Sequence, residues 1–91
     1  MKSREVDVLE IKNLKPLSKE VLRSEEQKKQ RFTKLKRAML MWNTIHEKSK
    51  IIFKAPDGIK SVEASVWFVS DKYVCLYAGI TLLVSSIIDV V

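Results

Sequence analysis

Residue types that could perform catalysis are few in this sequence and lie far apart. The single histidine, His46, and the single cysteine, Cys75, belong to different segments, and the carboxylates Glu63, Asp71 and Asp89 are isolated from one another. No glycine-rich phosphate loop, metal-ligand cluster or nucleophile elbow occurs. We interpret His46 as a packed or capping residue at a helix C-terminus and Cys75 as a packed thiol. The sequence therefore predicts a protein that is not an enzyme, with no cofactor, no metal and no small-molecule substrate.

Positive charge is the stronger chemical signal, and it is concentrated in residues 28–42, KKQRFTKLKRAMLMW. Six of the first ten of these residues are basic, and no acidic residue occurs from Lys28 to His46. A solvated helix face usually mixes glutamate with lysine at a spacing of four residues, so this bias favours a polyanionic partner. The candidate phosphate contacts are Lys29, Arg31, Lys34, Lys36 and Arg37. The alternative, a basic face that only solvates a surface helix, stays open.

The charge of the whole chain is divided unevenly between its halves. Residues 1–50 contain 14 Lys and Arg against 7 Asp and Glu, whereas residues 51–91 contain 3 against 4. The first half therefore carries the basic excess, which favours RNA, DNA or an anionic membrane surface as its partner. A single cysteine cannot form an internal disulfide and, with a charged N-terminus in place of a signal peptide, predicts a cytoplasmic location.

Residues 73–88 carry no charge and raise the question of a membrane anchor. A spanning helix needs about 20 apolar residues, and this run is shorter and contains Thr81, Ser85 and Ser86. Gly79 also lies where a hairpin would need it. We therefore expect strands here and no membrane span, although a basic helix lying on anionic lipid remains a third functional class.

A helix must position the basic residues. Pro16 separates residues 1–17, which we expect to form an N-terminal arm or an added strand, from a helical segment at residues 18–48. Ser24 and Gln27 form a capping-box pattern, with Ser18 as an alternative start. The helix should end near residues 46–48, with an apolar stripe facing a sheet and a basic face turned to solvent. The stripe comprises Phe32, Leu35, Met39 and Trp42.

After residue 49 the hydrophobic period changes from about 3.6 to about 2 residues, which indicates strands. Five runs alternate in this way, at 50–55, 59–69, 73–77, 80–84 and 87–91, with short turns between them. The alternation places these side chains in the core: Ile51, Phe53, Val62, Ala64, Val66, Phe68, Val74 and Leu76. We predict an α+β fold in which a long basic amphipathic helix packs on a five-stranded antiparallel, partly closed small β-barrel, residues 49–91.

This layout resembles that of the Sm-like and Src-homology-3-like small barrels. Those barrels have a long bent second strand, matched here by IKSVEASVWFV, and a one-turn 3₁₀ connection before the fifth strand, matched by VSS. The Sm-like group also places an N-terminal helix over the barrel, matched by residues 24–47. Because its aspartate, asparagine and glycine RNA-binding signatures are absent here, the resemblance implies a fold and no binding residues. The full chain also resembles small uncharacterised bacterial proteins.

Three aromatic residues, Trp67, Tyr73 and Tyr77, alternate with core positions and should lie on the outer face of the sheet. Bases could stack on Trp67 and Tyr73, or the helix could cover this face. The apolar final strand has Asp89 as its one charged residue and would be poorly protected as an edge, so we expect a closed sheet or a homo-oligomer in which strand edges pair. Two functional hypotheses follow: a module that binds the nucleic-acid backbone, or an oligomeric protein-interaction module without a nucleic-acid role.

Overall fold

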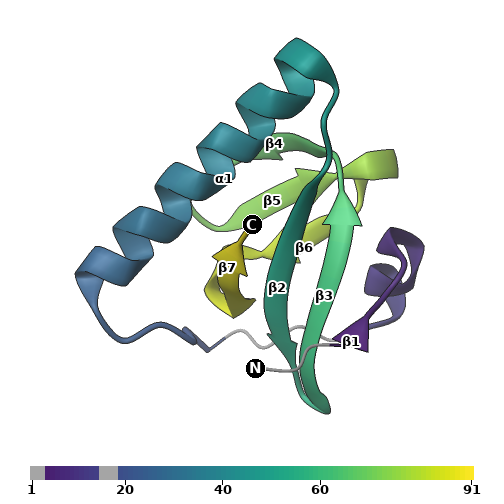
Figure 1. Ribbon diagram of the computed structural model, residues 1–91. Helices are drawn as coiled ribbons and strands as arrows, with labels where there is room; N and C mark the ends of the chain where they lie inside the picture. The colour runs from purple at the N-terminus through teal and green to yellow at the C-terminus, as the bar shows by residue number, and fades with distance from the viewer. Residues whose placement is uncertain (1–3, 15–18) are drawn as a thin grey trace.

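A computed structural model of the chain describes residues 4–14 and 19–91 as an α+β fold (Figure 1). The helices are η1 (Val8–Asn13, 3₁₀), α1 (Glu25–Ile45), η2 (Tyr77–Gly79, 3₁₀) and η3 (Val84–Ser86, 3₁₀). The strands are β1 (Arg4–Glu5), β2 (Ser49–Ala55), β3 (Gly58–Ala64), β4 (Val66–Val69), β5 (Tyr73–Leu76), β6 (Thr81–Leu83) and β7 (Ile87–Val90).

The strands form two sheets, of four strands in the order β1-β3-β2-β7 and of three strands in the order β4-β5-β6. All neighbours are antiparallel except β1, which lies parallel to β3 with Arg4 opposite Lys60. Each predicted turn joins two strands, and Gly58, at φ 139°, follows the turn between β2 and β3. A positive φ of this kind is accessible mainly to glycine.

The prediction of a five-stranded, partly closed barrel is wrong. Each of the five predicted runs does contain a strand, but the run at 59–69 is interrupted at Ser65. Its first part, β3, lies in the four-stranded sheet and its second part, β4, lies in the three-stranded sheet. Because β1 adds a further strand, the described residues contain seven strands in two sheets. The sequence VSS forms the single 3₁₀ turn η3, as expected.

Helix α1 begins and ends where its capping residues indicate. The Ser24 hydroxyl accepts a hydrogen bond from the Gln27 backbone N–H at 3.0 Å, and the Gln27 side chain accepts one from the Ser24 N–H at 3.5 Å. This confirms the capping box, while the alternative start at Ser18 lies outside the described residues. At the other end His46 adopts a left-handed conformation, with φ 56°, and its N–H donates to Trp42 O. His46 is therefore the C-cap residue.

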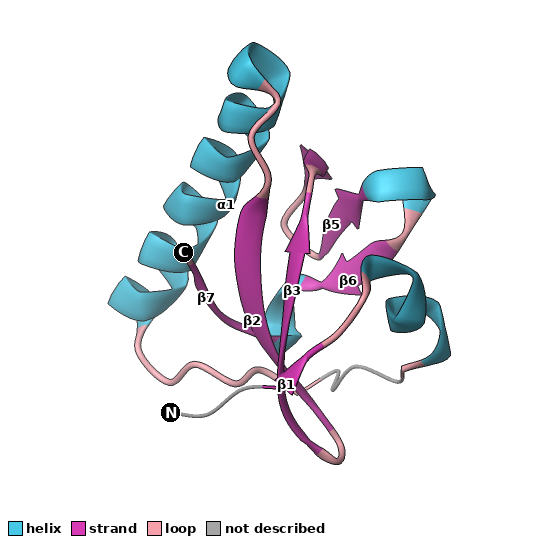
Figure 2. Cartoon of the chain, turned by 45° about the vertical axis from the view of Figure 1, so that its right-hand side comes forward, coloured by secondary structure: helices cyan, strands magenta, loops and turns pink. Residues whose placement is uncertain are grey.

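The two sheets enclose one core, and a helix lies along each side where they meet (Figures 1 and 2). Helix α1 packs on β4 and β7, which are one edge strand of each sheet; we call this side the α1 seam. Helix η1 packs on β3 and β6 on the opposite side, which we call the η1 seam. Val6 and Ile11 are buried in the core, so the N-terminal segment is part of the fold.

The prediction that Phe68 points into the core is wrong, because 61% of its surface is exposed. The pairing of β4 with β5 shifts register between Val66 and Phe68. Such a bulge adds one residue to a strand and reverses the alternation beyond it. Trp67 and Phe68 consequently both face solvent, and Val69 returns to the core.

Candidate functional site

The outer face of α1 carries three basic side chains that have no ionic partner among the described residues. Lys29, Lys36 and Arg37 are exposed, and they face away from the buried Leu35 and Ala38. Lys29 and Lys36 are seven residues apart, so they lie on one stripe of the helix. The Lys36 ammonium lies 4.9 Å from the centre of its own helix's Phe32 ring. That cation–π contact is weak at an exposed site, so Lys36 remains able to bind a second partner.

Arg31 is not part of this face, although the sequence placed it there. Its side chain is only 5% exposed and forms a bidentate ion pair with Glu20, with both N···O distances at 2.7 Å. One of the same nitrogens, Nη1, also donates to the carbonyl of Ile87 at 3.0 Å. The hydrogen bond from Arg31 lowers the pKa of Glu20 to about 2 against the opposing effect of burial, with help from the Leu22 N–H. Arg31 therefore joins the segment before α1 to β7 and is removed from the set of phosphate contacts.

Lys34 occupies an intermediate position on the flank of α1. Its ammonium lies 2.7 Å from Asp89 Oδ1, and the two side chains remain 46% and 43% exposed. The hydrogen bond from Lys34 lowers the pKa of Asp89. Together with the hydrogen bond from Arg31 to the Ile87 carbonyl, this pair connects α1 to β7, on which the helix packs. Exposed ion pairs of this kind are weak, so Lys34 can exchange Asp89 for a phosphate.

The structure does not bring the candidate stacking residues to the basic face. Trp67 is 42% exposed, its indole N–H donates to Ser65 Oγ at 2.9 Å, and its ring meets Tyr77 edge-on with centroids 5.9 Å apart. Helix α1 packs on β4, the strand that carries Trp67, and the Trp42 ring of α1 meets His46 with centroids 5.1 Å apart. Within the described ranges, neither a hydrogen bond nor a ring contact connects Trp67 or Tyr73 to a basic side chain of α1.

Tyr73 is half exposed and lies beside a depression of mixed charge, which includes Glu20 and Asp71 together with Arg31 and Lys72. The same two acidic residues line the neighbouring depression, which contains Lys28, Lys29 and Arg31. Tyr73 also lines a second surface.

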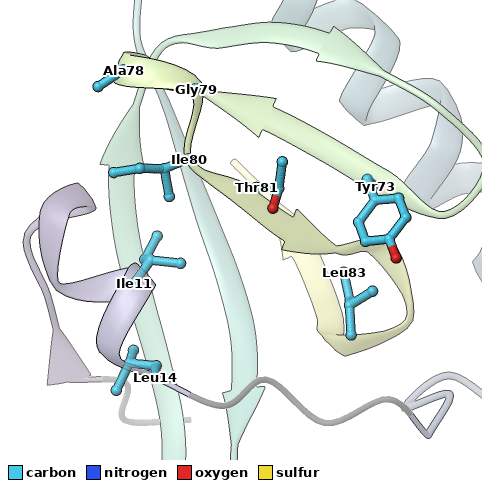
Figure 3. A pocket seen from close by; sticks show the side chains of 8 residues that line it. All are labelled: Ile11, Leu14, Tyr73, Ala78, Gly79, Ile80, Thr81 and Leu83. Carbon is cyan, nitrogen blue, oxygen red and sulfur yellow. The ribbon is translucent and has the colours of Figure 1, made fainter.

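That surface is a groove in the η1 seam, with a volume of about 600 Å³ (Figure 3). It lies between η1 and β6 and is lined by Ile11, Leu14, Tyr73, Ala78, Gly79, Ile80, Thr81 and Leu83. Sequence reasoning missed it because η1 was not expected. The available signal was Asp7, whose carboxylate accepts a hydrogen bond from the Leu9 N–H at 2.9 Å and begins the helix. Aspartate is a preferred N-cap residue.

Cys75 and His46, the residues considered for catalysis, both lie within secondary-structure elements or at their ends. Cys75 lies on β5 with its thiol 3.8 Å from the carbonyl of Leu76, and His46 ends α1. Across residues 4–14 and 19–91, His, Cys, Asp and Glu nowhere gather in a group of three that could hold a metal ion. In the same ranges, none of the helices is both long and apolar enough to cross a membrane.

Comparison with known proteins adds no relative. No protein family, curated protein or solved structure shows a detectable match to the chain.

Proposed function

We propose that the protein is a non-catalytic binding module that holds the phosphate backbone of RNA or DNA on the outer face of α1. The observation that carries this proposal is the presence of Lys29, Lys36 and Arg37 on the outer face of α1, where they are exposed and have no carboxylate partner in the described residues. From Lys28 to His46 the helix offers no acidic residue to neutralise them. Phosphate contacts by lysine and arginine release counterions and are independent of base sequence.

Two further residues have secondary roles in this proposal. Lys34 adds a fourth phosphate contact when it leaves Asp89, at a cost of about 1 kcal/mol or less for an exposed pair. The half-exposed ring of Trp67 is the remaining candidate for base stacking, because Tyr73 faces the groove. Single-cysteine content and basic charge are compatible with a cytoplasmic protein that meets RNA or DNA there.

We also propose that residues 49–91 follow the Sm-like and Src-homology-3-like layout in an opened form. What supports this is the chain order: β2 lies between β3 and β7, the second run continues from one sheet into the other at Ser65, and η3 precedes the last strand. This likeness concerns the fold and does not itself assign a ligand.

The test is a titration of fluorescein-labelled single-stranded RNA and of duplex DNA, followed by anisotropy at several salt concentrations. We compare the wild type with a triple variant, Lys29→Gln, Lys36→Gln and Arg37→Gln. The matched control is Lys48→Gln, Lys50→Gln and Lys54→Gln, which removes the same charge from exposed residues outside α1. The helix variant should weaken binding and lower the log–log salt slope by about three units. Equal effects of the two triple variants would overturn the proposal.

A second candidate function, an oligomeric protein-interaction module, is favoured by a different observation. Four aromatic side chains on or next to the three-stranded sheet are exposed: Trp67, Phe68, Tyr73 and Tyr77. Exposed aromatic residues are enriched in protein interfaces. Light scattering over a range of protein concentrations distinguishes the candidates, since a homo-oligomer with no RNA or DNA affinity would favour the interaction module.

A further inference from the structure

Within the described part of the chain, strand β6 pairs through only one of its two edges. It is the terminal strand of the three-stranded sheet, where Val74 of β5 lies opposite Leu82. On either side of that pair, Val84 N donates to Lys72 O at 2.9 Å and Leu76 N donates to Ile80 O at 2.6 Å. The hydrogen-bonded positions of β6 are therefore residues 80, 82 and 84.

In an antiparallel pair the residues between hydrogen-bonded positions direct their N–H and C=O groups to the other side. On β6 these residues are Thr81 and Leu83. The Leu83 carbonyl accepts a hydrogen bond from Ser86 Oγ at 2.7 Å. The N–H groups of Thr81 and Leu83 and the Thr81 carbonyl then face the groove, and they form the beginning of an incomplete ladder.

The described residues that line the groove beside this edge are mostly apolar. Ile11 of η1 and Leu14, which follows η1, lie on the side of β6 away from β5, and Tyr73 and Leu83, which are cross-strand neighbours, form another wall (Figure 3). Among the described residues, no lysine, arginine, aspartate or glutamate lines it. A ligand that fits must therefore combine backbone hydrogen-bonding groups in strand geometry with apolar side chains.

We propose that this groove binds an extended, uncharged peptide segment of a partner protein, which adds a strand to β6. Main-chain hydrogen bonds to Thr81 and Leu83 give the segment its register, and alternate apolar side chains fill the space beside Tyr73 and Leu14. The volume of about 600 Å³ suits a short segment of this kind. The site is independent of the basic face of α1.

The geometry favours a single segment over the other possible occupants. A second copy that paired its own β6 here would carry its β5 about 4.8 Å further out, towards the space that Ile11 of η1 and Leu14 occupy. Nucleic acid would find no cation for its phosphates among the described residues that line the groove. One extended chain is narrower than a pair of strands and needs no cation.

The test uses a phage-displayed library of random octapeptides selected on the wild-type protein, followed by titration of synthetic peptides from the selected sequences. We expect uncharged sequences with alternating apolar residues. The variant Thr81→Pro removes one outward N–H without touching the ladder to β5. Ile80 before it is extended, at ψ 131°, which a following proline requires, and edge strands accept proline at such positions. Affinity should fall about tenfold.

Two further variants keep the test decisive. Thr81→Val retains the N–H and should bind the peptides as the wild type does. Leu14→Glu places a charge in the groove and should also reduce affinity at least tenfold, even if Thr81→Pro folds poorly. Selection of no peptide, or equal binding by all variants, would overturn the proposal. So would a wild-type dimer that Thr81→Pro converts to a monomer, since a second copy would then occupy the edge.

Discussion

The two seams of the molecule join the same pair of sheets in different ways. At the α1 seam a 21-residue helix fills the gap between β4 and β7 with Leu35 and Ala38, and the ion pair between Arg31 and Glu20 fixes its beginning. At the η1 seam a six-residue 3₁₀ helix packs on β3 and β6 and buries Ile11, which is 2% exposed. The short helix presents too little apolar surface to fill its gap, so a groove remains there.

Because of this difference, the two seams should bind different kinds of ligand. The α1 seam is closed on its inner side, and the outer side of the helix offers charge from Lys29, Lys36 and Arg37 beside the exposed Leu40. The η1 seam is open, and the described residues that line its groove carry no charge, so it offers apolar surface and the free backbone groups of β6. If the comparison is correct, changes at the first seam should alter stability and phosphate binding, and changes at the second should alter peptide binding.

The largest expected effect is on the free energy of unfolding, when one buried residue from each seam is replaced by alanine. Leu35→Ala should destabilise the protein by about 4 kcal/mol, because it leaves a closed cavity, whereas Ile11→Ala should cost about 2 kcal/mol. The cavity left by Ile11 opens into the existing groove, so mainly the transfer free energy of the removed atoms is lost. Urea unfolding followed by tryptophan fluorescence measures both. Equal losses would mean that the η1 seam is filled as tightly as the other.

The ion pair at the α1 seam provides the next prediction. Glu20→Gln should lower the free energy of unfolding by about 3 kcal/mol, since it leaves a buried guanidinium without its carboxylate. The Nε of Arg31 does not compensate for the lost carboxylate, because it is buried and has no hydrogen-bond partner in the described residues. The double variant Glu20→Gln, Arg31→Met should be more stable than Glu20→Gln alone. A loss below about 1 kcal/mol would mean that this ion pair contributes no more than an exposed surface pair.

Acid should abolish the same contribution. The pKa of Glu20 is lowered in the folded protein from 4.5 to about 2, so ionised Glu20 stabilises the fold fully above pH 4.5. As the pH falls from 4.5 towards 2, the unfolded chain takes up the proton first and the stabilisation is lost. The difference in unfolding free energy between wild type and Glu20→Gln should therefore shrink across this window and disappear near pH 2. A difference that stays constant would mean that the pKa of Glu20 is not lowered in the folded protein.

Local patterns in the sequence predicted the parts of the fold that depend on neighbouring residues. The capping box at Ser24, the runs that became strands and the burial of Ile51 and Phe53 all follow from spacing along the chain. The exposure of Phe68 does not, because a bulge depends on the pairing of β4 with β5. The division at Ser65 likewise depends on which sheet each half joins.

The candidate sites were less predictable, because they depend on partners far away in sequence. Arg31 and Lys34 occur in the same basic run, and composition gives no reason to separate them from Lys29. Their separation comes from Glu20, Ile87 and Asp89, which reach α1 only in the folded chain. The groove depends on η1 lying beside β6, a contact between the two ends of the sequence.

The smallest expected effect tests where the closed seam ends and the basic face begins. Lys34 and Asp89 are close to half exposed, so the coupling energy from a double-mutant cycle with Lys34→Gln and Asp89→Asn should be about 0.5 kcal/mol and should fall at high salt. A coupling above about 2 kcal/mol would mean that Lys34 is held in the seam as Arg31 is and cannot contact phosphate. A weak, salt-sensitive coupling instead leaves Lys34 available, and Lys34→Gln should then lower the salt slope of nucleic-acid binding by about one unit.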